Sequence, residues 1–162
     1  MGSAGIIGRM KNIRLATLAA VLVLSILAPA CAKQPGAAAA CVPVVRDGWI
    51  RLVPGMDSMQ AGFGRIENRC ATPALIIGAR SPAHANAELH ETKIIDGVNR
   101  MRAVPQLRIA PDAAAVLKPG GLHLMLMDAR APLKAGSKVA IEFPLQDGRV
   151  VRGEFVVKAP GE

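Results

Sequence analysis

Three side chains that can bind a soft metal ion alternate along one short segment of the chain. In "GGLHLMLMD" (120–128), His123, Met125 and Met127 occupy every second position, with leucines between them. Alternate side chains of a β-strand point to opposite faces of the sheet, so a strand here separates the leucines from the imidazole and the two thioethers. Thioethers are soft, neutral ligands that select Cu(I), whereas hard cations prefer oxygen ligands. The segment therefore predicts a strand with a candidate copper-binding face.

A second pair of the same side-chain types lies in a predicted β-hairpin. Asp96-Gly97, between two apolar-rich runs, is a strong signal for a hairpin with a two-residue loop. In that register His90 and Met101 are diagonal neighbours on one face, roughly 7–8 Å apart. If this face meets the face of His123 and Met125, the four side chains form a His₂Met₂ site.

The elements that must position these residues are short strands. From residue 41 onward, β-prone runs alternate with turn signals such as Asp96-Gly97 and Pro119-Gly120-Gly121, and no stretch has a convincing helical period. This spacing predicts an all-β sandwich or barrel. The expected strands are 42–45, 48–53, 61–68, 74–80, 87–95, 98–104, 113–118, 122–127, 137–143 and 149–157.

The first 30 residues are typical of a secretory signal. Three basic residues precede the apolar run 15–28, and Ala28-Pro29-Ala30 supplies a small-x-small cleavage site. Residues 1–9 are interpreted as an upstream extension, because Met10-Lys11 is typical of a natural start. The remaining expectations are a flexible tether over 31–40, a copper-binding β-sandwich domain over 41–158 and a C-terminal tail over 159–162. Export predicts a periplasmic location.

The three cysteines are interpreted in this exported setting. Exported thiols oxidise, so Cys41 and Cys70 are predicted to form a disulfide. Cys31 directly follows Ala30, where a bacterial lipoprotein carries its acylated cysteine. Lipidation of Cys31, with membrane anchoring, is therefore predicted. Ordinary cleavage after Ala30 is the alternative, because Pro29 makes the lipobox imperfect.

Charge and composition argue against two classes of function. The net charge of +8 includes three basic residues in the signal segment, so the rest of the chain carries 17 basic and 12 acidic residues in scattered positions. One tryptophan, three phenylalanines and no tyrosine leave little for base stacking, so nucleic-acid binding is not expected. No Ser-His-Asp or Cys-His constellation and no glycine-rich phosphate loop is apparent, so an enzyme is not expected either.

Other histidines and methionines receive lesser roles. Met127 points the same way as Met125 and is interpreted first as a wall of the site and second as a reserve ligand. His84 is expected to be exposed, with an accessory part in copper capture as its alternative. Met56 and Met59, in "PGMDSM", are expected in the core or on the surface, with a place near the mouth of the site as the alternative.

The ligand spacing resembles that of a known family. The pattern H-x10-M-x21-H-x-M, within "ELHETKIIDGVNRMRAV" (88–104) and "LKPGGLHLMLMDARAPLKAGSKVAIEF" (117–143), is similar to the PCuAC family of periplasmic copper chaperones. The likeness runs from about Trp49 to Val157. It implies a Greek-key, cupredoxin-like β-sandwich or barrel. The ligands that it implies for Cu(I) are His90, Met101, His123 and Met125.

The chain departs from the family pattern at two points. Many relatives have methionine where this chain has Thr92, and some end in a His/Met-rich tail that takes Cu(II), whereas this chain ends in "KAPGE". Neither departure removes one of the four expected ligands.

The resemblance also implies a function and partners. The expectation is a monomeric metallochaperone that delivers copper to the copper-bearing subunit of cytochrome c oxidase, alongside a Sco-type thioredoxin-like protein. The first alternative is a metal-free β-sandwich interaction or assembly module. The second, a cupredoxin electron carrier, needs a cysteine thiolate beside two histidines, and no cysteine lies near His123 or Met125 in the sequence.

Overall fold

The structure is a computed structural model that describes residues 41–56 and 58–162, and the predicted signal segment, the tether and Cys31 lie outside the described residues. Ten strands make up the described part, and the all-β prediction is confirmed. None of the residues described forms a helix with the length and apolar character that a bilayer span needs. The strands are β1 Val44–Arg51, β2 Met59–Asn68, β3 Ala74–Ile76, β4 His84–Ile95, β5 Val98–Ala103, β6 Leu107–Ile109, β7 Ala113–Leu117, β8 Leu122–Ala129, β9 Lys138–Pro144 and β10 Val150–Lys158.

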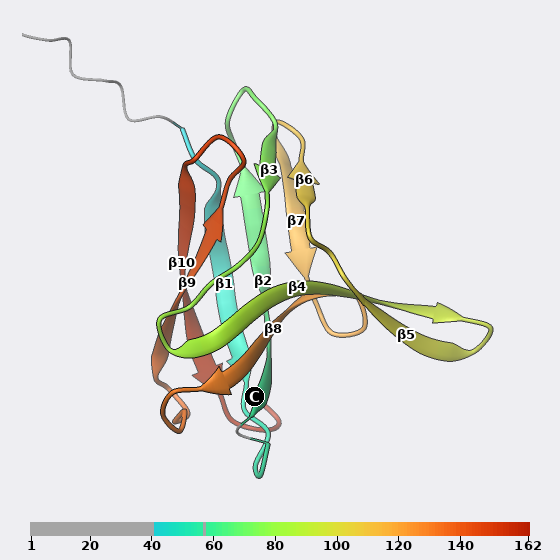
Figure 1. The fold of residues 1–162 in the computed structure, drawn as a ribbon, viewed down its shortest axis with the longest axis vertical. Helices are drawn as coiled ribbons and strands as arrows, with labels where there is room; N and C mark the ends of the chain where they lie inside the picture. The colour runs from blue at the N-terminus through green and yellow to red at the C-terminus, as the bar shows by residue number, and fades with distance from the viewer. Residues whose placement is uncertain (1–40, 57) are drawn as a thin grey trace, which may run out of the picture. The chain divides into compact units, whose positions relative to one another are not determined.

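Eight of the strands form one mixed sheet (Figure 1). Their order is β5-β4-β8-β2-β1-β10-β9, and β7 pairs with β2 beyond the end of β8. Of the paired strands in the described part, only β1 and β10 run parallel to each other. β3 and β6 form a second, two-stranded sheet. A bridge from Arg80 to Glu142 joins that region to the edge strand β9, and a bridge from Ile76 reaches Leu145, directly after β9. The main sheet therefore curls toward a barrel.

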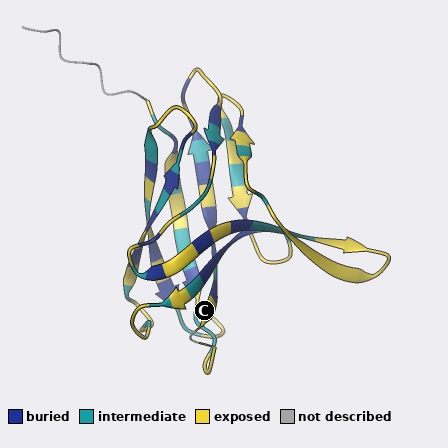
Figure 2. Ribbon diagram, in the orientation of Figure 1, coloured by how far each residue is buried: buried dark blue, intermediate teal, exposed yellow. Residues whose placement is uncertain are grey.

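Buried residues recur along the strands of the main sheet (Figure 2), and the core lies on the inner face of this curled sheet. Leu124 and Leu126 of β8, which strand alternation assigns to the core, are fully buried. They pair with Leu89 and Ala87 of β4, which point to the same inner face. Fully burying one such leucine is worth about 1.5–3 kcal/mol. The apolar face thus holds β8 against the body and leaves its second face for other contacts.

Strand β1 differs from the prediction of two separate strands around Asp47-Gly48. It is one strand with a register shift between Arg46 and Trp49, and Asp47 has φ of 52°. Gly64 of β2 lies against this bulge, where a Cβ would come within 3.0 Å of the carbonyl oxygen of Arg46. The turn-forming pair therefore makes a bulge, because β2 continues to pair with β1 on both sides of it.

The short strand β6 was not predicted.

The hairpin β4–β5 has the predicted two-residue loop. Ile95 pairs with Val98, and Thr92 pairs with Met101. Asp96 and Gly97 both have positive φ, 51° and 75°. These are the left-handed conformations that a type I′ turn requires at both central positions. The hairpin extends away from the other strands of the sheet (Figure 1).

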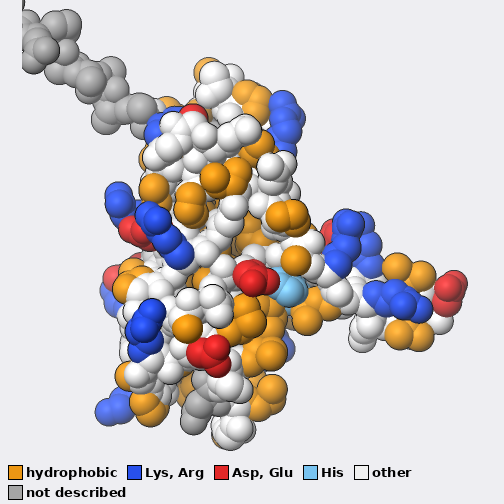
Figure 3. All heavy atoms as spheres, in the orientation of Figure 1, with side chains coloured by type: hydrophobic (Ala, Val, Ile, Leu, Met, Phe, Trp, Pro, Cys, Tyr) orange, Lys and Arg blue, Asp and Glu red, His pale blue; other side chains and the backbone are white. Residues whose placement is uncertain are grey.

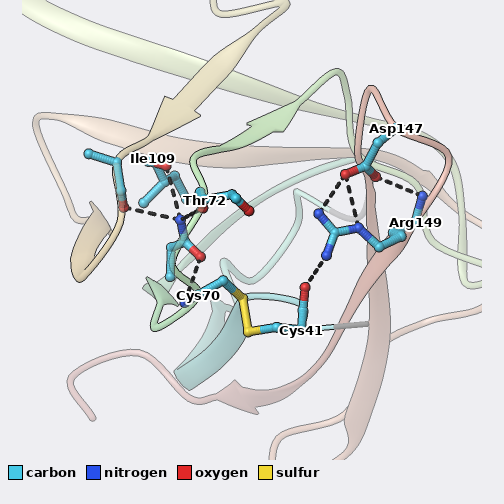
Figure 4. The surroundings of a disulfide bond; sticks show 8 residues. Cys41, Cys70, Thr72, Ile109, Asp147 and Arg149 are labelled. Atoms are coloured by element: carbon cyan, nitrogen blue, oxygen red, sulfur yellow. Dashed lines mark hydrogen bonds and ion pairs between the residues drawn. A yellow bond between two sulfur atoms is a disulfide. The ribbon is translucent and has the colours of Figure 1, made fainter. Parts of the chain in front are cut away.

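The predicted Cys41–Cys70 disulfide is confirmed (Figure 4). It joins the start of the described chain to the end of β2. Close by, the buried side-chain amide of Asn68 donates to the carbonyl oxygens of Thr72 and Ile109, at 2.9 and 3.2 Å. The Arg149 guanidinium donates to the Cys41 carbonyl oxygen and is held by Asp147. This end of the fold is closed by covalent and polar contacts.

Candidate metal centre

Two of the predicted ligands face each other across β4 and β8. His90 and His123 are directly paired in the antiparallel register, so their side chains leave the sheet on the same face. The ring centroids are 6.2 Å apart and the ring planes are tilted by 45°. Metal–nitrogen bonds of about 2 Å to each ring fit a separation of this size. The sheet register therefore brings the two imidazoles together from distant parts of the sequence.

A backbone carbonyl orients the His123 ring. The Nδ1 atom lies 2.8 Å from the carbonyl oxygen of Gly121, which accepts a hydrogen bond and therefore requires the proton on Nδ1. The same oxygen accepts the backbone N–H of Thr92 at 3.1 Å. His123 is only 6% exposed. Its Nε2 lone pair is the one left for a metal ion.

A carboxylate orients the His90 ring in the opposite sense. The Nε2 atom lies 3.0 Å from a carboxylate oxygen of Glu88, so Nε2 carries the proton and donates. The Nδ1 atom is buried and has no hydrogen-bond partner among the described residues. A buried polar atom without a partner is costly unless a ligand or ion completes it. The chemistry of this nitrogen fits a metal ligand.

The two thioethers approach the histidines from different depths. Met125 follows His123 on the same face of β8, pairs with Glu88 on β4, and is only 7% exposed. Met101 lies on β5 as a diagonal neighbour of His90, and it is 54% exposed. One sulfur is therefore sheltered by the sheet, and the other is open to solvent on the projecting hairpin.

The donor set favours a soft, monovalent ion. Two imidazoles and two thioethers are all neutral, so Cu(I) would leave the site with a single positive charge beside the Glu88 carboxylate. The described residues hold no group of three or more His, Cys, Asp or Glu that could bind a metal ion. A histidine next to an acidic side chain is visible where the hairpin leaves the body (Figure 3).

Glu88 and the Gly121 carbonyl were not predicted as parts of the site. Glu88 stands two residues before His90, so strand alternation alone places both on one face, and this signal was available in the sequence. The Gly121 carbonyl carried no signal, because a backbone acceptor can be recognised only once the turn before β8 is folded.

The predicted exposure of His84 is wrong. It is only 2% exposed, and its ring nitrogens lie 3.4 Å from Ser81 Oγ and 3.2 Å from Gln60 Oε1. Burial lowers the pKa of His84 below its ordinary value, so the neutral ring is favoured. His84 is thus a polar residue of the core with both nitrogens partnered. Met127, by contrast, is half-buried on the same face as Met125.

Solved structures define the class of this domain. A Cu(I)-bound structure of DR1885 from Deinococcus radiodurans is 30% identical, with a TM-score of 0.61 over 81% of this chain and 88% of that one. The apo structure of the same protein is 27% identical, with a TM-score of 0.58 over 96% and 99% of the two chains. The copper-bound PCuAC domain from PmoF2, 18% identical with a TM-score of 0.58 over 72% of this chain and 92% of that one, shares the fold. The fold is therefore that of PCuAC copper chaperone domains, as the sequence resemblance implied.

Residues 44–157 match the family described as "Putative lipoprotein LpqE-like", and the chain belongs to this family. A relative from Leifsonia xyli subsp. xyli, described as "Putative lipoprotein Lxx21020", is 35% identical over 143 residues, which is 85% of this chain and 84% of that protein. Both descriptions are of lipoproteins, in agreement with an exported protein.

Proposed function

We propose that this protein is an exported Cu(I) metallochaperone whose ligands are His90, Met101, His123 and Met125. The observation that carries the proposal is the buried Nδ1 of His90, which has no hydrogen-bond partner within the described part of the chain and lies on the face that His90 shares with His123. If the domain were a metal-free interaction module, this nitrogen would remain buried without a partner. Cu(I) satisfies it and matches the two neutral thioethers beside it.

The donor set fits a protein that carries copper better than a blue-copper protein that carries electrons. A blue-copper site needs a cysteine thiolate. Both described cysteines are joined in the Cys41–Cys70 disulfide, which lies just after the last residue of β2, whereas the candidate site lies toward the first residue, Met59. Four protein ligands also leave no open position for a reacting water, so the role is binding and handover rather than catalysis.

Handover of copper follows from the unequal exposure of the two sulfurs. Met101 is reached from solvent while Met125 is sheltered. An acceptor's ligand can therefore replace Met101 first, before the buried ligands release the ion. Cu(I) keeps its oxidation state throughout, because each step is an exchange of ligands with no electron transfer.

The proposed acceptor is the copper-bearing subunit of cytochrome c oxidase, with a Sco-type thioredoxin-like protein acting in the same delivery. The support is the PCuAC resemblance of the ligand segments. The proposed location is the periplasm, with a lipid anchor on Cys31. A Cys31→Ser variant should then leave the membrane fraction.

The test is an anaerobic Cu(I) titration of the protein against a chromophoric Cu(I) chelator. We expect the wild type to bind one equivalent of Cu(I) tightly. In Met101→Ile/Met125→Ile the affinity should fall more than about a hundredfold, because even the loss of a residue that only hydrogen-bonds to a metal ligand costs 10–100-fold. Met56→Ile, in the loop before β2, is the matched control and should bind like the wild type. No tight binding, or equal binding by the folded double variant, would refute the proposal.

A further inference from the structure

Methionines are concentrated on one face of the main sheet. The described residues contain five methionines, and four of them lie on the outer face of the strands β5, β8 and β2. Two of the four, Met101 and Met125, belong to the proposed site. The other two, Met59 and Met127, are not among its four proposed ligands.

Met59 and Met127 form a cross-strand pair. Met59 begins β2 and lies directly opposite Met127 of β8. Side chains in this relation have Cβ atoms about 4.5–5.5 Å apart, so two flexible thioethers can converge on one ion. Met125 is two residues before Met127 on the same face and is therefore a diagonal neighbour of Met59. Three thioether side chains are thus neighbours on the outer face, where β2 begins and β8 approaches its end.

Packing does not account for this pair. A methionine that fills a gap in a core is buried, but Met59 is 42% exposed and Met127 is half-buried. The inner face of the same strands is occupied by Gln60 and Leu126, which are buried. The two thioethers therefore stand on the outer face, where a polar or charged side chain would be the ordinary choice.

The surroundings of the pair favour a soft ion. On the β4 side, the residue opposite Met127 is Asn86, and Glu88 lies opposite Met125. On the β2 side, Met125 faces Ala61, which pairs in turn with Arg51 of β1. Among the described residues, these neighbours offer one carboxylate, already hydrogen-bonded to His90, and no cluster of acidic side chains for a hard cation. Figure 3 shows hydrophobic side chains gathered on this face below the visible histidine.

We infer that Met59 and Met127, together with Met125, form a second and weaker Cu(I) site that adjoins the His₂Met₂ site. This inference rests on the proposed function, because Met125 is shared between the two. When the tight site is filled, Met125 is engaged there, and Met59 and Met127 hold the second ion. Thioethers without an imidazole bind Cu(I) less tightly than the mixed set. The site is also more exposed. Copper therefore moves between solvent and the tight site by exchange of neutral ligands at Met125.

The test follows each methionine separately. The full chain, with Cys31→Ser so that no free thiol competes, is labelled with ¹³C at the methionine methyl groups and titrated anaerobically with Cu(I). The first equivalent should shift the methyl signals of Met101 and Met125. The second should shift those of Met59 and Met127, while Met56 in the neighbouring loop stays unchanged.

A double variant completes the test. Met59→Leu/Met127→Leu conserves side-chain volume, and it should lose the second equivalent while the affinity for the first stays within about twofold of the wild type. Met56→Leu is the matched control and should keep both. Signals of Met59 and Met127 that stay fixed with excess Cu(I), or that move only with the first equivalent, would overturn the second site. Failure of Met101 and Met125 to respond to the first equivalent would instead count against the proposed function.

Discussion

The two histidines of the candidate centre are held in opposite tautomers by different kinds of partner. The Gly121 carbonyl fixes the proton of His123 on Nδ1, and Glu88 fixes the proton of His90 on Nε2. One ring therefore presents Nε2 and the other Nδ1. A partner on the far nitrogen orients a ligand ring and raises its basicity, so these acceptors are part of the binding chemistry.

Replacing Glu88 by alanine should weaken Cu(I) binding. The proton on the His90 ring loses its acceptor and the site loses its nearest negative charge. We expect the affinity for Cu(I) to fall about tenfold. This is the low end of the range for residues that hydrogen-bond to a metal ligand, because Glu88 is half-exposed. Chelator competition measures the affinity, and ¹⁵N spectra of the imidazoles report whether the Nε2–H tautomer of His90 is lost.

Two further variants separate positioning from general effects of charge. Glu88→Gln keeps an oxygen acceptor and should recover the tautomer and part of the affinity. Glu154→Ala removes a carboxylate that is paired with Lys138 and should bind like the wild type. An unchanged tautomer and affinity in Glu88→Ala would show that the hydrogen bond has no role in binding.

Strand alternation predicted which faces the site residues occupy, but it could not predict their partners. His123 and Met125 were assigned to the face opposite the leucines, and the structure agrees. His84 was misjudged because alternation of β4 breaks at its first residues, near Asp128, whose φ is 53°. Its burial depends on Gln60, which is distant in the sequence, and no local pattern reports such a contact.

At the scale of elements, the hairpin β4–β5 couples a local turn to the site. The six residues of β5 are all exposed, so this strand has little core to hold it. Its position depends on pairing with β4 and on the turn at Asp96 and Gly97. Turn chemistry of this kind is encoded in two adjacent residues, which is why the hairpin register was predictable. The bulge in β1 was not, because it depends on how β2 pairs with both halves of that strand.

Gly97→Ala should loosen the hairpin and lower the affinity for Cu(I). A residue with a Cβ at φ of 75° costs about 1–2 kcal/mol. We expect roughly a fivefold loss of affinity, in line with about 1 kcal/mol, because the pairing of β5 no longer holds Met101 beside His90. Global thermal stability should fall only slightly, because β5 is exposed and the hairpin can open locally to relieve the strain without unfolding the rest of the domain.

Asp96→Asn is the matched control for the turn. Asparagine tolerates the left-handed conformation at this position, so the turn type and the affinity should be retained. Chelator competition compares the two variants directly. If Gly97→Ala bound Cu(I) as tightly as Asp96→Asn, the hairpin turn would not be a determinant of the site.

At the scale of the whole described domain, strand β2 separates two specialised ends. Met59 begins β2 beside the candidate copper sites, and Asn68 ends it next to the Cys41–Cys70 disulfide. Ten residues of strand span roughly 30 Å. The disulfide end stabilises the fold and receives the chain at Cys41, while the proposed copper ligands lie toward the other end.

This separation predicts that stability and copper binding can be changed independently. Cys41→Ser/Cys70→Ser removes a covalent link between positions 29 residues apart and should lower the free energy of unfolding by about 3 kcal/mol. Chemical denaturation of both proteins under oxidising conditions measures this loss. In the temperature range where the variant is still folded, its Cu(I) affinity should stay within about twofold of the wild type, because the candidate site and the disulfide lie toward opposite ends of β2. A large loss of affinity in the folded variant would mean that the two ends are coupled through β2, and the sheet would then transmit the redox state of the cysteines to the metal centre.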